Sequence, residues 1–343
     1  MTITEKKKNK RIVRDMKECF RSFHLPVQDI KSPHADQMNV LFGSQLCNDH
    51  VCAIVVVMHG RPEGYVGMEA DFHFKVPSER IAEAMQLLNL FNGISPLFGY
   101  AICQCCNGVS MHASLFLPDG SLPQGKFKRL IHEMLEDAYL SFPLIVEVMN
   151  GGNPDDLGAR FVEGCRDLKE IGKGISSEVA GTILSDMESV LHDLEISIRE
   201  EDRHDDGLAV YFKTPEQFDF DLCIIMELLN DRALLALDLI PSFTIPDEKI
   251  ALVTESVIRI NKNLKFGCMY IDRENKRVKF RIRIMIDNGV LDKKEFRNAV
   301  DAMLPAGCFF FSIIKEQLSS NENLEALLAK HLETGKDCHQ QSE

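Results

Sequence analysis

The feature that most constrains the fold of this chain is an internal repeat at a separation of about 169 residues. Val76-Pro77-Ser78-Glu79-Arg80-Ile81-Ala82 matches Ile245-Pro246-Asp247-Glu248-Lys249-Ile250-Ala251. Further matches at this separation include Gly120 with Gly289 and Phe127 with Phe296. The matched positions are apolar residues, turn glycines and a helix-opening proline, which are the positions that a fold dictates. The sequence therefore predicts a duplication, in which one fold is built twice.

The length of the chain agrees with two domains, because 343 residues are many for a single core. The repeat places the first domain at residues 10–150 and the second at 177–335, with a linker that carries a short helix at 151–176. In each copy the residue pattern predicts a helix, three strands, a helix, two strands and a helix. This order predicts an α+β fold, with helices packed on one face of a mainly antiparallel sheet.

The individual elements are expected at matching places in the two copies. Helical spacing of apolar residues predicts opening helices at 12–25 and 179–196. Pro77 and Pro246 should each open the central helix. Strands are expected at 37–42, 51–58 and 65–74, and at 207–212, 220–229 and 233–243. The closing hairpins turn at Asn107-Gly108 and Glu274-Asn275-Lys276, long helices start near 123 and 291, and helical tails span 157–168 and 324–332.

A second pattern marks the last hairpin. In the second copy it runs from Asn261 through Leu264 and Phe266-Gly267 to Tyr270-Ile271-Asp272. In the first copy either Asn89 or Asn92 leads to Phe98-Gly99, and the Tyr-Ile-Asp end is replaced by Ile-Cys-Gln. This pattern resembles the YbjN family of bacterial sensory transduction regulators, and the resemblance spans both copies. The family has the fold of type III secretion chaperones.

The resemblance implies a protein-interaction module, chaperone-like or regulatory, that is not an enzyme and has no catalytic or cofactor-binding residues. Type III chaperones bind extended segments of partner proteins and usually work as homodimers. A fused double copy would supply both halves of such a dimer, so we expect a monomer with intramolecular pairing of the two domains. Residues 1–150 carry a net charge of −1 and residues 151–343 one of −12, so the two halves favour an asymmetric protein partner.

Composition bears on location and on the class of partner. No apolar stretch approaches the roughly 20 residues that cross a bilayer, so no membrane association is expected. MTITEKKKNK at the start is polar and is followed by no apolar signal core, which predicts a cytoplasmic protein. Eleven scattered cysteines suit a reducing compartment. A net charge of −13 disfavours nucleic acid as a partner.

A group of cysteines is the main candidate for chemistry. Cys103, Cys105 and Cys106 lie at the hairpin turn, His112 lies on the return strand, and Cys47, His50 and Cys52 surround an earlier turn. Thiolates and imidazoles are zinc ligands. However, Cys-x-Cys-Cys is not zinc-ribbon spacing, and in an extended strand Cys106 would face away from Cys103 and Cys105. The second copy has Asp272, Glu274 and Asn275 here, so incidental thiols without metal are the favoured interpretation. The alternative is a metal- or thiol-dependent protein that uses this cluster.

Two charged patterns have structural explanations. Lys279, Arg281 and Arg283 alternate with apolar residues, which predicts a half-buried strand whose polar side faces solvent or a partner. The acidic run at 199–206 lacks the glycine and terminal glutamate of an EF-hand, which favours a loop. Nucleophile-elbow, zinc-protease and phosphate-loop motifs do not occur in the sequence.

Overall fold

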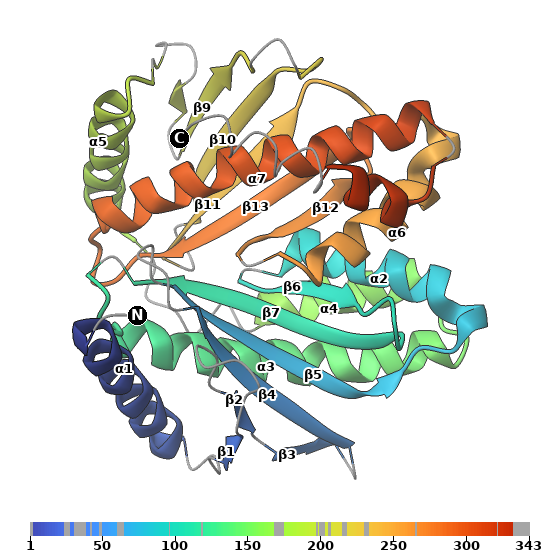
Figure 1. The fold of residues 1–343 in the computed structure, drawn as a ribbon, viewed down its shortest axis with the longest axis horizontal. Coiled ribbons are helices and arrows are strands. Elements are labelled where there is room, and N and C mark those ends of the chain that lie inside the picture. The colour runs from blue at the N-terminus through green and yellow to red at the C-terminus, as the bar shows by residue number, and fades with distance from the viewer. Residues whose placement is uncertain are drawn as a thin grey trace.

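The computed structural model is a mixed α+β structure with antiparallel sheets, as the sequence predicts (Figure 1). Two sheets lie one above the other in Figure 1, and α2 and α6 meet at their junction. The residues described are 3–23, 28–30, 39–41, 43–47, 50–59, 65–95, 97–117, 119–167, 175–196, 198, 203–204, 207–214, 218–229, 233–264, 266–320 and 322–331.

The N-terminal half is drawn in blue to green. Its helices are α1 (Ile3–Ser22), α2 (Ile81–Ile94), α3 (Gln124–Met149) and α4 (Pro154–Asp167), and a single 3-10 turn, η1 (Ser78–Arg80), precedes α2. Its strands are β1 (Gln28–Ile30), β2 (Asn39–Leu41), β3 (Gly43–Cys47), β4 (His50–His59), β5 (Tyr65–Lys75), β6 (Gly99–Ile102) and β7 (Gly108–Phe116).

The C-terminal half is drawn in yellow-green to red. Its helices are α5 (Ser177–Asp193), α6 (Ile250–Asn261), which follows the 3-10 turn η5 (Asp247–Lys249), α7 (Lys293–Ser319) and a tail helix at 324–331. Its strands are β8 (Arg203–His204), β9 (Gly207–Phe212), β10 (Leu222–Leu229), β11 (Leu234–Pro241), β12 (Cys268–Asp272) and β13 (Arg277–Met285). The sequence did not predict β1, β3 or β8. The strand expected at 37–42 corresponds to β2, which pairs with β1 in a separate two-stranded sheet, and β3 takes the edge of the main sheet instead.

The two main sheets have corresponding strand orders. The first is β3-β4-β5-β7-β6, and the second is β9-β10-β11-β13-β12 with β8 added beside β9. Residue pairing also recurs at a separation of 169: Tyr65 with Phe116 and Leu234 with Met285, Tyr100 with Met111 and Met269 with Phe280, Ile102 with Val109 and Ile271 with Val278. The same side chains of each repeat unit therefore face the same side of their sheets.

Turns and helix starts recur in the same way. Pro77 and Pro246 precede η1 and η5, so both prolines open the central helices as expected. Asn107 and Lys276, which are 169 residues apart, both have a positive φ at the end of the hairpin turn. Gly120 and Gly289 have φ values of +60° and +73°, which is the backbone region that glycine adopts without strain. The repeated glycine therefore has a conformational cause.

Each half has its own apolar core, and each contributes side chains to the core of the other. Phe116 belongs to the cluster of the C-terminal half. Met285, its counterpart at a separation of 169, belongs to the cluster of the N-terminal half, together with Leu234 and Ile258. This exchange of apolar side chains joins the halves.

The segment predicted as a linker is mostly part of the first core, which corrects the expectation for 151–176. Helix α4 packs against α2 and α3, and the centres of the Phe161 and Phe91 rings are 4.1 Å apart. Leu157, Phe161 and Cys165 are buried in the same cluster. The reason is the apolar stripe of this short helix, which must be covered. Residues 168–174, the remaining centre of the linker, lie outside the described residues.

Candidate functional site

The halves meet along the edge strands β6 and β12, where asparagine side chains form hydrogen bonds with backbone groups on the outer edge of each strand. Asn92 accepts a hydrogen bond from Tyr100 N at 2.5 Å and donates to Tyr100 O at 3.1 Å. Asn261 makes the same two bonds to Met269 N and O, at 2.7 and 2.9 Å. Asn92 and Asn261 are 169 residues apart, and so are Tyr100 and Met269. Asn92, rather than Asn89, therefore occupies the position of the motif asparagine in the first copy.

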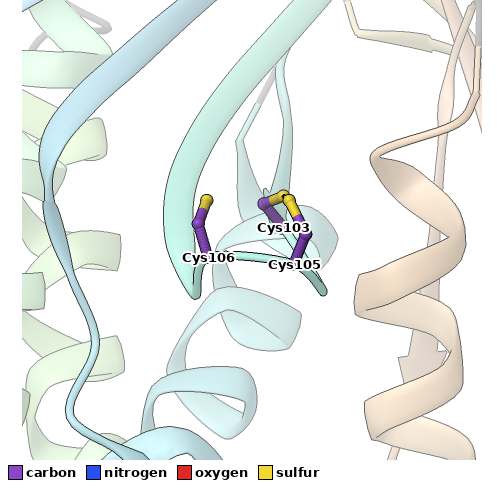
Figure 2. Close-up of side chains that lie close together, drawn as sticks. All are labelled: Cys103, Cys105 and Cys106. Carbon is purple, nitrogen blue, oxygen red and sulfur yellow. The ribbon is translucent and has the colours of Figure 1, made fainter.

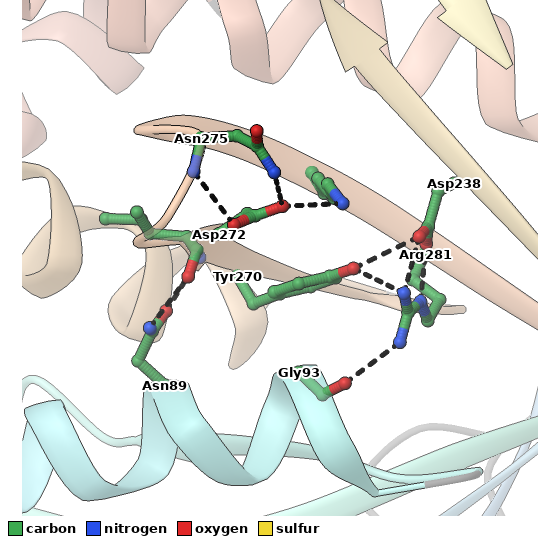
Figure 3. A network of polar contacts seen from close by, with 9 residues as sticks. Asn89, Gly93, Asp238, Tyr270, Asp272, Asn275 and Arg281 are labelled. Carbon is green, nitrogen blue, oxygen red and sulfur yellow. Dashed lines mark hydrogen bonds and ion pairs between the residues drawn. The ribbon is translucent and has the colours of Figure 1, made fainter. Parts of the chain in front are cut away.

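Asn89 has a different role, because it crosses between the halves. Its side chain accepts from Ile271 N at 2.8 Å and donates to Ile271 O at 3.1 Å, as Figure 3 shows. Asn261 also donates to Tyr100 O across the interface at 3.3 Å. These amides satisfy buried peptide groups that an additional strand would otherwise satisfy.

A polar cluster on the second sheet reaches α2 of the first half (Figure 3). Arg281 contacts both carboxylate oxygens of Asp238 and the Tyr270 hydroxyl, and its Nη1 donates to Gly93 O at 3.0 Å. Burial alone would lower the pKa of Arg281, but the hydrogen bonds and charge of Asp238 raise it above its ordinary value. Burial, followed by the charge of Asp238, raises the pKa of Tyr270. Arg281 therefore stays charged and Tyr270 stays neutral.

The counterpart of this cluster on the first sheet uses other residues. Lys262, at the position of Gly93 in the repeat, forms ion pairs with Glu69 and with Asp71 at 3.7 Å, and lies 3.2 Å from Ser110 Oγ. Burial alone would lower the pKa of Lys262, but Glu69 raises it. Polar side chains therefore connect each sheet to the central helix of the other half.

Lys126 and Glu295 form a buried ion pair between the halves, with only 9% and 3% of their side chains exposed. Burial raises the pKa of Glu295, and the charge of Lys126 opposes that rise. The pair lies beside a hollow of about 450 Å³ whose lining also includes Asp119, Asp287 and Asp292. The two residues are 169 positions apart, so equivalent positions of the repeat touch one another here.

A groove of about 850 Å³ lies between the first turns of α2 and α6. Most of its lining consists of six residue pairs at a separation of 169: Ser78 with Asp247, Ile81 with Ile250, Ala82 with Ala251, Glu83 with Leu252, Met85 with Thr254 and Gln86 with Glu255. Arg259 and Arg273 complete the lining. The groove is therefore built mainly from equivalent positions of the two halves, and the C-terminal half adds the two arginines.

The three cysteines of the first hairpin come together. Their Sγ atoms lie within 4.8 Å of one another, and those of Cys103 and Cys105 are 2.9 Å apart (Figure 2). Partial burial would raise the pKa of Cys103, but hydrogen bonds from Cys105 and Cys106 lower it to about 7. The hydrogen bond to Cys103 raises the pKa of Cys105 to about 11. The expectation that Cys106 faces away was wrong, because residues 104–106 form a turn and not a strand.

The other candidate metal ligands do not join this group. His112 is buried in the interface, where its Nε2 lies 3.1 Å from Gly267 O, and burial lowers its pKa. Among the described side chains, Cys103, Cys105 and Cys106 are the one group with the spacing of metal ligands. The side chains of Cys47, His50 and Cys52 lie outside the described residues.

The two charged patterns singled out in the sequence, the basic row and the acidic run, have different outcomes in the structure. The row of Lys279, Arg281 and Arg283 is half-buried, and Arg281 faces the other half of the same chain. Lys279 pairs with Asp272 at 2.8 Å, and burial lowers the pKa of Arg283 to about 10. Most of the acidic run at 199–206 lies outside the described residues, although Arg203 forms an ion pair with Glu188 at 2.9 Å.

Comparison with known proteins adds little to this geometry. No family model and no curated protein matches the chain. Among solved structures, a double mutant of I-SmaMI aligns with 68% of this chain and 74% of its own, at 13% identity and a TM-score of 0.10. A TM-score this low carries no argument about fold or function. Among the described helices, none is both long and apolar enough to cross a membrane.

Sequence reasoning missed Lys126, Lys262 and Glu295, which join the halves, and it named Asn89 only as a candidate for the motif asparagine. Their roles depend on how two domains pack, which local periodicity does not encode. One signal was present, since Lys126 and Glu295 occupy the same place in the repeat with opposite charges. A comparison of charges between repeat positions would have singled out this pair.

Proposed function

We propose that the chain is a tandem pair of related domains that acts as a protein-interaction module and holds a segment of a partner protein in the groove between α2 and α6. The domains pair within the chain, as the subunits of a type III secretion chaperone pair with each other. The resemblance to the YbjN family supports a chaperone-like or regulatory role in bacteria. The scattered cysteines favour a cytoplasmic location.

The observation that carries the proposal is the composition of the groove. Its floor and walls include Ile81, Met85, Ile250 and Leu252, and Leu252 is 37% exposed although it is a large apolar residue. Charged side chains, among them Glu83, Asp247, Glu255 and Arg259, lie around these apolar positions. Apolar anchoring surface surrounded by polar groups is typical of sites that bind protein segments.

The paired positions also favour an asymmetric partner. Glu83 on one wall corresponds to Leu252 on the other, and Met85 corresponds to Thr254. The two walls therefore offer different chemistry to a segment that lies across them, so one orientation of the segment is favoured. The distribution of net charge between the two halves agrees with this preference.

Site-specific photocrosslinking tests the proposal. A photoreactive amino acid replaces Leu252 in the groove, and in matched variants it replaces Tyr139 on α3 or Tyr211 on β9, which are 60% and 65% exposed outside the groove. In extract from the source cells we expect a discrete crosslinked partner from position 252 and none from the other two. Equal labelling at all three positions, or labelling at position 211 alone, would show that the groove is not the binding surface.

A further inference from the structure

The turn between β6 and β7 carries a group of thiols that protein binding does not use. We propose that Cys103, Cys105 and Cys106 form a site for one monovalent copper ion, Cu(I), a role beyond the proposed function. The three sulfur atoms come from four consecutive residues and lie within 4.8 Å of one another. A single ion placed between them can contact all three after small side-chain rotations.

The turn is held in place before any ion binds. Cys103 N donates to Gly108 O at 2.8 Å, and Asn107 N donates to Cys103 O at 2.8 Å. Gln104 donates to Glu325 of the tail helix, which ties the turn to the other half of the molecule. A site on a fixed backbone loses less conformational entropy when it binds its ion. Cys105 and Cys106 are exposed, so an ion can reach the sulfur atoms from solvent.

The number and type of ligands select the ion. Thiolate is a soft ligand that favours Cu(I) and zinc over magnesium or calcium. Structural zinc sites almost always use four protein ligands in a tetrahedron. Within the part of the chain that the structure describes, no histidine or carboxylate joins the three thiols. A three-sulfur site therefore suits Cu(I) better than zinc.

The second half shows that the turn does not need these thiols. Asp272, Glu274 and Asn275 stand at the corresponding positions, and Asp272 accepts hydrogen bonds from Asn275 N at 3.1 Å and Asn275 Nδ2 at 2.9 Å. The equivalent hairpin closes with carboxylate and amide groups. Three converging cysteines are thus a property of the first half alone and not a requirement of the fold.

Competition for Cu(I) tests the site in the full-length protein. The protein is titrated without oxygen against Cu(I) held by bicinchoninate, and the colour of the chelator complex reports the copper that the protein removes. One variant carries Cys103→Ser, Cys105→Ser and Cys106→Ser, and the matched control carries Cys223→Ser and Cys308→Ser, two partly exposed cysteines elsewhere. Circular dichroism confirms that both variants are folded.

We expect the wild-type protein and the control to remove one equivalent of Cu(I) that the triple variant does not remove. X-ray absorption of the wild-type complex should show three sulfur ligands. Binding should weaken as pH falls, because the thiols release protons to the solvent when they bind the ion. Equal copper binding by the triple variant, no binding by the wild type, or a four-coordinate zinc complex of higher affinity would each overturn the proposal.

Discussion

The buried pair of Lys126 and Glu295 shows how single residues stabilise the junction of the halves. Two opposite charges in low dielectric attract strongly, but each has lost its hydration, so the net contribution of such a pair is small. Removing only one partner is different, because the remaining charge stays buried without compensation. Glu295 already has a raised pKa for this reason, even with Lys126 beside it.

Replacing Lys126 alone by methionine should therefore lower the free energy of unfolding by about 3–5 kcal/mol. Replacing both residues, as Lys126→Met with Glu295→Met, should restore most of that loss, because no buried charge remains. Urea unfolding of the two variants and the wild type measures the difference. A double variant that is as unstable as Lys126→Met would contradict this account of the pair.

His112 should make the stability of the junction depend on pH. Burial holds the pKa of His112 below its ordinary value of about 6.5, with Gly267 O and Glu69 opposing burial and Lys262 acting with it. Below pH 6.5 the unfolded chain binds a proton that the folded chain does not, so acid favours unfolding. The free energy of unfolding should fall from pH 7.5 to 5.5 with a slope of at most about 1.4 kcal/mol per pH unit from this residue.

The matched variant for this prediction is His112→Gln, whose amide can still reach Gly267 O but does not titrate. Urea unfolding at several pH values should show a shallower decline for the variant than for the wild type. Parallel curves for the two proteins would mean that His112 titrates alike in the folded and unfolded states.

Cys105 and Cys106 are exposed, so their replacement should matter little when no metal is present. Changing both to serine should alter the free energy of unfolding by no more than about 1 kcal/mol, as at ordinary surface sites. Thermal unfolding in the presence of a chelator gives the measurement. A larger loss of unfolding free energy, measured with no metal present, would mean that the thiols stabilise the turn itself.

At the scale of elements, the edge strands β6 and β12 are closed by asparagines at the ends of α2 and α6. Asn261 is fully buried and holds Met269 N, Met269 O and Tyr100 O. Without Asn261 the two Met269 groups would lose this partner, at a cost of about 1–3 kcal/mol for each unsatisfied group, whereas Tyr100 O also accepts a hydrogen bond from Asn92. The asparagine thus joins helix, strand and neighbouring half.

Asn261→Ala should accordingly lower the free energy of unfolding by about 1–3 kcal/mol or more, because at least one buried backbone group loses its partner. Asn263→Ala is the matched control, because Asn263 is exposed two residues further along the chain. Urea unfolding should separate the two variants clearly. Equal stability would mean that water replaces the amide of Asn261 without loss.

Elements were largely predictable from the sequence, whereas contacts between them were not. Apolar periodicity and the repeated prolines and glycines placed α2, α6 and the closing hairpins, because those signals are local. Helix α4 was assigned to a linker because the preceding Asn-Gly-Gly-Asn-Pro indicates a boundary, while its burial depends on α2 and α3. Cys106 was misplaced because a strand was extended through a turn that ends with Asn107 at positive φ.

At the scale of the whole molecule, the two halves pack against each other within the chain. Helix α2 packs against α6 and β12, and α6 packs against α2 and β6 in return. The hairpin turns also reach across: Gln104 contacts Glu325, and Arg273 lies 3.1 Å from Asp155 of α4. Because both halves belong to one chain, their effective concentration is near millimolar, which favours pairing within the chain.

We therefore expect a monomer of 38.8 kDa at micromolar concentration. Light scattering coupled to size exclusion measures the mass directly. A stable dimer would show that another surface pairs between chains, and two domains that tumble independently by NMR relaxation would contradict the contacts between α2 and α6.

The contact between Lys126 and Glu295 also bears on the history of the gene. In a dimer of identical chains, a residue on the two-fold axis faces its own copy, so both sides carry the same charge. Opposite charges at that place require two different sequences, which a duplicated gene supplies. On the proposed duplication, Lys126 and Glu295 diverged after the two copies arose, because a dimer of identical chains would place two like charges together in this buried position.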